Sequence, residues 1–161
     1  MIKQISDHAA AAKLIRTELK KNGVKGTVRA SSYAGGSSIT VNLGDVLPAT
    51  RSAVADFAGR FEYGHFNGMT DCYEYSNTNA DLPQVSFVFV NVERADETRQ
   101  AAWDYCRKHW AGMEDAPESA KDARYFYCSA MNCYGDSLIN RTMSDDYKGG
   151  FWAQFKQRVA A

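Results

Sequence analysis

The chain has 161 residues, a length that fits one domain able to bury a core without disulfides or metal. Its 19 Lys and Arg balance 19 Asp and Glu. This neutrality disfavours proteins drawn to nucleic acid or anionic membranes by their total charge, and also acidic DNA mimics. No apolar run approaches the roughly 20 residues of a membrane span, and the N-terminus lacks the pattern of a signal peptide. We therefore expect a cytoplasmic protein that does not bind membranes.

The first predicted elements are a helix and a β-hairpin. Apolar residues recur every three or four positions between Ser6 and Gly23, which is typical of one buried helix face. From Thr27 to Ser31 and from Ser38 to Leu43, apolar residues alternate with polar ones, which is typical of strands. The glycine-containing segment from Tyr33 to Ser37 joins the two strands. We interpret it as a turn and not as a phosphate-binding loop, because it does not precede a helix.

The middle of the chain predicts two further helices and two further strands. Pro48 suits a first helical position, and helical spacing of apolar residues continues to Phe61. Met69 to Tyr75 is a third predicted strand. The β-branched and aromatic run from Val85 to Val92 predicts a fourth strand, central in the sheet. A third helix is expected from Asp96 to Trp110.

The remainder is expected to be helical. We predict a helix over the aromatic run Tyr125 to Tyr134 and a last helix from Phe151 to Val159. The element order α-β-β-α-β-β followed by helices predicts an α+β fold, with a small antiparallel sheet, helices packed on one face and a helical C-terminal part. We interpret residues 1–161 as a single domain, made of a sheet part over 1–93 and a helical extension over 94–161.

Short motifs in the first half carry a family resemblance. They are the runs AKLIRTELKK (residues 12–21), VRASSYAGGSSITV (28–41) and FNGMTD (66–71). Between Ala9 and Tyr75 the chain resembles the large polyvalent protein-associated domain family, which occurs in polyproteins of phages and conjugative elements and as short free-standing proteins. The resemblance implies an origin in a mobile genetic element and carries over no catalytic residue. The family pattern has Asp where Asn67 stands, which argues against an acidic pair with Asp71.

A partner-binding surface is expected around the loop from His65 to Tyr75. The loop is rich in aromatic residues with polar tips, and loops on a rigid scaffold often carry function. The alternative is that its aromatic side chains close one end of the core. The candidate binding residues, with two from the hairpin, are Arg29, Tyr33, Phe66, Asn67, Asp71, Tyr73 and Tyr75.

The four cysteines are interpreted as reduced thiols, with Cys106, Cys128 and Cys133 in the core, and no cofactor or metal is expected. Free cysteine is among the most buried residue types. The alternative is a four-ligand zinc site formed by Cys106, His109, Cys128 and Cys133. Their spacing differs from the tight Cys-x2-Cys pairs of zinc ribbons and fingers.

Three functions remain open at this point. The leading hypothesis is a non-catalytic binding protein of a phage or mobile element that inhibits a host defence component, such as a CRISPR effector, in the host cytoplasm. Its partner would be a host protein or a protein–nucleic-acid complex. One alternative is a nucleic-acid-binding module, with a basic patch formed by Arg16, Lys20, Lys21, Lys25 and Arg29 and with Tyr33 available to stack. The other is a small enzyme acting on nucleotides or a host protein, for which no catalytic motif is present.

Overall fold

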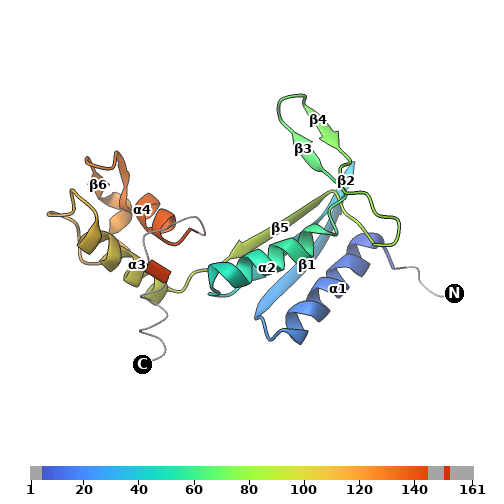
Figure 1. The fold of residues 1–161 in the computed structure, drawn as a ribbon, viewed down its shortest axis with the longest axis horizontal. Coiled ribbons are helices and arrows are strands. Elements are labelled where there is room, and N and C mark those ends of the chain that lie inside the picture. Colours follow the sequence, from blue (N-terminus) through green and yellow to red (C-terminus); the bar gives the residue numbers. More distant parts are fainter. Residues whose placement is uncertain (1–4, 145–150, 153–161) are drawn as a thin grey trace. The chain divides into compact units, whose positions relative to one another are not determined.

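The structure is a computed structural model that describes residues 5–144 and 151–152. The chain divides into two compact units, Met1–Glu93 and Arg94–Ala161, each with its own hydrophobic core (Figure 1). Helices and small sheets make up both units, so the predicted α+β class is confirmed. That the two units form one cooperative domain stays a prediction.

Unit 1 contains a three-stranded sheet in the order β1-β2-β5, formed by β1 (Gly26–Tyr33), β2 (Gly36–Leu43) and β5 (Phe87–Val92). β1 and β2 form the expected antiparallel hairpin. β5 runs parallel to β2, so the expectation of an antiparallel sheet was wrong for this strand. The physical reason is the connection, because α2 (Pro48–Gly59) lies between β2 and β5 and returns the chain in the same direction.

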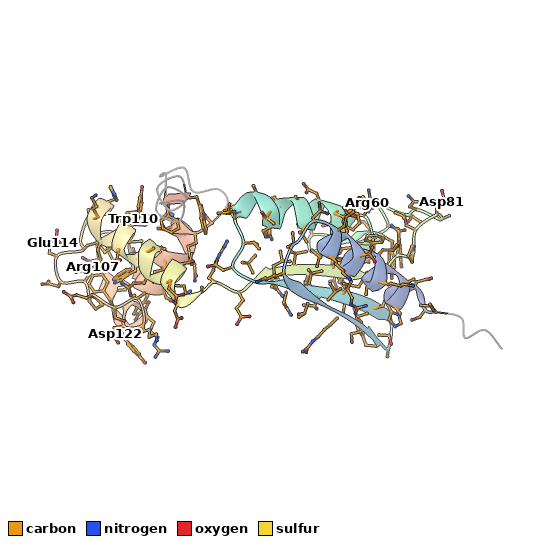
Figure 2. All side chains as sticks on the ribbon, turned by 90° about the horizontal axis from the view of Figure 1, so that it is seen from below. Arg60, Asp81, Arg107, Trp110, Glu114 and Asp122 are labelled. Atoms are coloured by element: carbon orange, nitrogen blue, oxygen red, sulfur yellow. The ribbon has the colours of Figure 1, made fainter. Side chains whose placement is uncertain are left out.

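One face of this sheet is covered by helices. α1 (Asp7–Lys21) packs against β1 and β2, and α2 packs against β5 (Figure 2). Alternating strand residues point toward both helices, as the period of two requires. The core they enclose includes Ala11, Ile15, Leu19, Val28, Ile39, Val41, Leu43, Val54, Ala58 and Phe61.

A second, smaller hairpin extends from unit 1. It consists of β3 (His65–Asn67) and β4 (Cys72–Glu74), which pair only with each other, and it projects from the sheet in Figure 1. The predicted strand from Met69 to Tyr75 is therefore shorter than expected and lies outside the main sheet. The turn at its start explains this, because Asp71 has a φ of 53°, which ends the extended backbone.

Unit 2 begins with the expected third helix, α3 (Asp96–His109). The predicted helix over residues 125–134 is wrong. A single 3-10 turn (Ala123–Tyr125) leads into a short hairpin of β6 (Tyr127–Cys128) and β7 (Cys133–Tyr134). Asn132 has a φ of 52°, a conformation that turns the chain within the hairpin and that Asn tolerates well.

A short helix, α4 (Gly135–Thr142), follows directly and was not predicted. Together with α3 it forms the core of unit 2 around Trp103, which is fully buried and donates its indole N–H to the Pro117 carbonyl at 2.7 Å. Phe151 and Trp152 are helical, and the rest of the predicted last helix lies outside the described residues. Within the described part of the chain, no helix is long and apolar enough to cross a membrane.

Two neighbouring residues of α1 provide a test of the core of unit 1. Ile15 is fully buried, whereas Leu14 is 43% exposed. Ile15→Ala should lower the free energy of unfolding by about 2–5 kcal/mol, because it leaves a cavity. Leu14→Ala is the matched control and should change it by about 0.5 kcal/mol. Far-UV circular dichroism during urea denaturation measures both, and equal losses would contradict the packing of α1.

Candidate functional site

The face of the three-stranded sheet opposite α1 and α2 is open within the described residues of unit 1. Strand pairing arranges its side chains in rows across the sheet. Arg29, Thr40 and Phe89 form one row, and Ser31, Ser38 and Phe87 form the next. We call this surface the open face; its members are Thr27, Arg29, Ser31, Tyr33, Gly36, Ser38, Thr40, Asn42, Phe87, Phe89 and Asn91. Arg29 is the only charged residue in the three strands.

A continuous series of aromatic rings begins on the open face and extends to the hairpin β3–β4. Phe89 stacks beside Phe87, with centroids 6.2 Å apart and planes at 15°. Phe87 meets the edge of Tyr73 at 5.6 Å. Tyr73 contacts Tyr63 and Tyr75, and these two rings stack on each other at 5.5 Å and 14°. We call these five residues the aromatic band. Tyr75 is 70% exposed and Phe89 50%, so both ends of the band face solvent.

Ser86 holds the band in place. Its hydroxyl accepts the backbone N–H of Ser37 at 3.1 Å and hydrogen-bonds the Tyr63 hydroxyl at 2.7 Å. Its carbonyl accepts the Tyr73 hydroxyl at 2.6 Å. Ser86 is buried, so these bonds replace water and are costly to lose. The positions of two rings are therefore fixed by hydrogen bonds as well as by stacking.

The hydroxyl of Tyr73 remains a donor throughout the neutral range. Burial, followed by the Glu62 carboxylate and the neighbouring Tyr63 and Tyr75, raises the pKa of Tyr73 to about 12. Since an ordinary tyrosine titrates near 10, this hydroxyl keeps its proton to higher pH. At neutral pH the hydroxyl is therefore protonated and able to donate to the Ser86 carbonyl.

Tyr33 lies beside the band, over Gly36. A Cβ atom at residue 36 would come within 2.9 Å of the Ser86 hydroxyl and within 3.0 Å of the Tyr33 ring. Only glycine leaves room for both neighbours at this position. Tyr33 is 49% exposed and extends the aromatic surface across the end of the hairpin β1–β2.

Four of the predicted binding residues come together on this surface. Arg29 and Tyr33 lie on the open face, and Tyr73 and Tyr75 belong to the band. Phe66 pairs with Tyr73 across the hairpin and is exposed. The pairing places Phe66 next to the band, since directly paired residues point to the same face of a hairpin.

Two predicted residues shape the hairpin instead. The Asn67 side chain accepts the backbone N–H of Met69 at 3.0 Å and donates to the Glu74 carboxylate at 2.6 Å. Asp71 has the positive φ of the turn. The structure therefore places both in the turn geometry that presents Phe66 and Tyr73.

Sequence reasoning missed Tyr63, Phe87 and Phe89. The run from Val85 to Val92 predicts a central strand, whereas β5 is an edge strand of the sheet. A usable signal existed, because Phe87, Phe89 and Asn91 alternate with three valines. Asn91 in that series indicates that the phenylalanines share a face that is open to solvent.

The proposed basic patch is divided between two sides of the sheet. Arg16 lies on α1 and donates to the carbonyl of Val28 at 2.7 Å. Arg29 points to the open face, opposite the one that α1 covers. The structure thus separates Arg29 and Tyr33 from the lysines of α1.

The alternative zinc site is not assembled. Among residues 5–144 and 151–152, no three His, Cys, Asp or Glu side chains are grouped closely enough to hold a metal ion. The Cys106 thiol lies 3.1 Å from the Thr142 hydroxyl, and Cys128 donates to the Ala111 carbonyl at 3.5 Å. The ring of His109 packs against Tyr105, with centroids 4.3 Å apart. Of the four candidate ligands, Cys128 and Cys133 lie opposite each other in the hairpin β6–β7.

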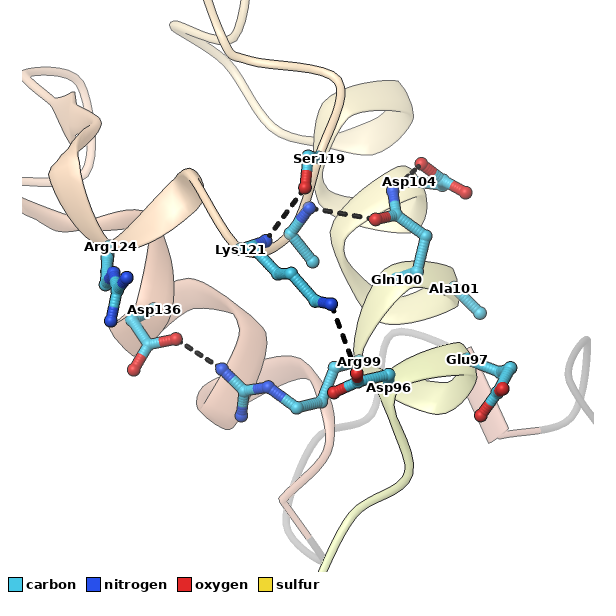
Figure 3. Close-up of a pocket in the computed structure, with 11 residues that line it drawn as sticks. Asp96, Glu97, Arg99, Gln100, Ala101, Asp104, Ser119, Lys121, Arg124 and Asp136 are labelled. Carbon is cyan, nitrogen blue, oxygen red and sulfur yellow. Dashed lines mark hydrogen bonds and ion pairs between the residues drawn. The ribbon is translucent and has the colours of Figure 1, made fainter.

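Unit 2 contains a polar cavity of about 810 Å³ beside the start of α3 (Figure 3). Two ion pairs cross its lining: Arg99 with Asp136, and Lys121 with Asp96 at 3.4 Å. Gln100 donates to the Glu118 carbonyl at 2.8 Å and accepts the backbone N–H of Ala120 at 2.9 Å. These bonds attach the segment 117–121 to α3, so we assign the cavity a structural role.

Comparison with known families places the chain in a class of domains associated with large polyvalent proteins. Residues 6–144 match large polyvalent protein associated domain 29, and the chain belongs to this family. The resemblance noted between Ala9 and Tyr75 is confirmed and extends into both units. Membership associates the chain with phages and other mobile genetic elements. No curated protein and no solved structure matches it.

Ser86→Ala tests the anchoring of the band. The substitution leaves the Ser37 N–H and the Tyr63 hydroxyl without this partner, so it should destabilise unit 1 by about 1–3 kcal/mol. Ser31→Ala, on the exposed part of β1, is the control and should have little effect. Urea denaturation followed by circular dichroism measures both. Equal stability of the two variants would show that Ser86 does not hold the band.

The reactivity of the thiols tests the structure around Cys106. Burial raises the pKa of this thiol to about 11, and the thiolate is the reactive form. Iodoacetamide at pH 8 should alkylate exposed Cys72 quickly and Cys106 far more slowly, whereas in urea both should react alike. Peptide mass spectrometry measures the rates. Equal native rates, or stoichiometric zinc in the purified protein, would contradict this environment.

Proposed function

We propose that the chain is a non-catalytic binding protein of a phage or other mobile element, and that it contacts its partner through the aromatic band and the open face. The observation that carries the proposal is the band itself, five rings in mutual contact with Tyr75 and Phe89 exposed at its ends. Exposed contiguous apolar surface is a mark of interaction sites. Because Ser86 fixes Tyr63 and Tyr73, and Tyr75 and Phe87 pack on these rings, the middle of the band has little side-chain entropy to lose on binding.

For the biological role, we propose inhibition of a host defence component, such as a CRISPR effector, in the cytoplasm of the host cell. The partner is then a host protein or a protein–nucleic-acid complex. Family membership supports this role, since a mobile element that enters a cell meets such defences. The hairpin β3–β4 adds Phe66 and the almost fully exposed Met69 at the border of the same surface.

Substitutions in the band should weaken binding without unfolding the protein. Tyr75→Ala and Phe89→Ala should each cost roughly 1–3 kcal/mol of binding, because a few aromatic residues dominate most interfaces. Tyr125→Ala is the matched control, since Tyr125 is a tyrosine of unit 2 with 73% exposure. The measurement is recovery of partners from host lysate by the tagged full chain, with the melting temperature of each variant recorded.

The biological role needs a separate readout. Cells with an active CRISPR system and a targeted phage should give more plaques when they express the chain, and Phe89→Ala should abolish the increase. Unchanged immunity at full expression of the wild-type protein would contradict the counter-defence role. Equal recovery of partners by wild type and band variants would contradict the proposed contact surface.

A further inference from the structure

We propose that the open face and the aromatic band bind single-stranded nucleic acid, with bases stacked on Phe89 and Tyr75 and a phosphate near Arg29. This deepens the proposed function, on which it rests for the choice of surface. A protein–nucleic-acid complex with an exposed single strand would present such a ligand. Four observations of unit 1 support the inference.

The first observation concerns the rings. Base stacking needs aromatic faces that are accessible and held in place. Phe89 is half exposed and stacked beside Phe87, and Tyr75 is largely exposed and stacked on Tyr63. Two stacked pairs therefore lie at the two ends of one band, connected through Tyr73. A single strand that follows the band meets a stacking position at each end.

The second observation concerns charge. Arg29 is the only charged residue in the three strands, so the open face is positive and contains no carboxylate. Two acids lie near the band, and the Glu62 carboxylate is close enough to raise the pKa of Tyr73. Glu74 binds Asn67 and His65 on the hairpin, and Glu62 accepts the backbone N–H of Val88 at the edge of β5. A phosphate near Arg29 thus meets no acidic side chain on this face.

The third observation is the hydrogen-bonding character of the open face. Between the rings and Arg29 lie hydroxyl and amide side chains, namely those of Thr27, Ser31, Ser38, Thr40, Asn42 and Asn91. Such groups both donate and accept, which suits the edges of unpaired bases. Serine is depleted in protein–protein interfaces. The composition of the open face therefore favours nucleic acid over a protein partner.

The fourth observation selects single strands over duplexes. A surface that offers rings for stacking requires bases whose own faces are free, and in a duplex those faces are stacked on one another. The neutral chain also lacks the many cations that attach proteins to duplex backbones. When binding relies on stacking and on only one or two phosphate contacts, the affinity depends weakly on salt concentration. Affinity should fall only roughly 3- to 7-fold between 50 and 200 mM salt, by the slope of about 0.7 per phosphate for single strands.

The experiment is a titration of fluorescein-labelled oligonucleotides of about 12–16 nucleotides with the full chain, followed by fluorescence anisotropy. Poly-dT, poly-rU and a duplex of equal length are compared. The expected result is a dissociation constant of about 1–100 μM for single strands at 50 mM salt and weaker duplex binding. The difference between dT and rU reports on contacts to the ribose hydroxyl.

Variants assign the binding to the surface. Phe89→Ala and Tyr75→Ala should each weaken single-strand binding by about 5- to 100-fold, whereas Tyr125→Ala should not change it. Phe89→Leu keeps an apolar side chain but removes the ring, so it should lose as much as alanine. Phe89→Trp should retain binding. The three natural tryptophans all lie in unit 2, so the additional tryptophan fluorescence of Phe89→Trp comes from unit 1. A base that stacks on the new indole should quench this fluorescence.

Two results would overturn the inference: no binding of any single strand at 100 μM protein, or binding that Phe89→Ala and Tyr75→Ala leave unchanged. A different result would contradict the proposed function. If oligonucleotides do not bind but recovery of host partners still depends on Phe89 after nuclease treatment, the surface binds protein and only the inference about nucleic acid is wrong. If neither ligand depends on Phe89, both proposals are wrong.

Discussion

At the start of β5, Ser86 connects three parts of unit 1 that are far apart in the sequence. Its backbone and hydroxyl bond to Ser37 at the end of the first hairpin, and the same residue binds the hydroxyls of Tyr63 and Tyr73. Backbone hydrogen bonds between Val85 and the segment Phe61–Tyr63 also attach the hairpin β3–β4 to the sheet, and Ser86 adds the bonds that hold two of its neighbouring rings. The buried Ser86 therefore fixes two of the five rings of the aromatic band, and the other three pack on these two or on each other.

Sequence patterns over a few neighbouring residues predicted the elements whose structure depends mainly on those residues. The boundaries of α1, α3 and the first hairpin follow from helical spacing, alternation and turn residues. The parallel position of β5 depends on a crossover and leaves no trace in its own sequence. The aromatic run from Tyr125 to Tyr134 predicts a helix that does not form. The structure forms a hairpin there instead, with the left-handed residue Asn132 in its turn and Phe126 packed against Trp103.

The candidate surface was predictable in part for the same reason. Tyr73 and Tyr75 were visible because they occur in an aromatic-rich loop, and Tyr33 because it begins a turn. Phe87 and Phe89 belong to a strand, and which face of a strand is covered depends on helices elsewhere in the chain. The predicted basic patch is divided for the same reason. Residues that are near in the sequence can lie on opposite sides of a sheet, and their spacing does not show which side each one occupies.

The space around Gly36 also limits how the sequence of this family can change. A side chain at position 36 collides with both Tyr33 and Ser86, so it becomes possible only when those neighbours are smaller or move away. Substitutions at the three positions are therefore coupled, although residue 86 lies fifty positions after residue 36. In relatives that keep the aromatic surface, we expect covariation among positions 33, 36 and 86, with a larger residue at 36 accompanied by loss of the ring at 33.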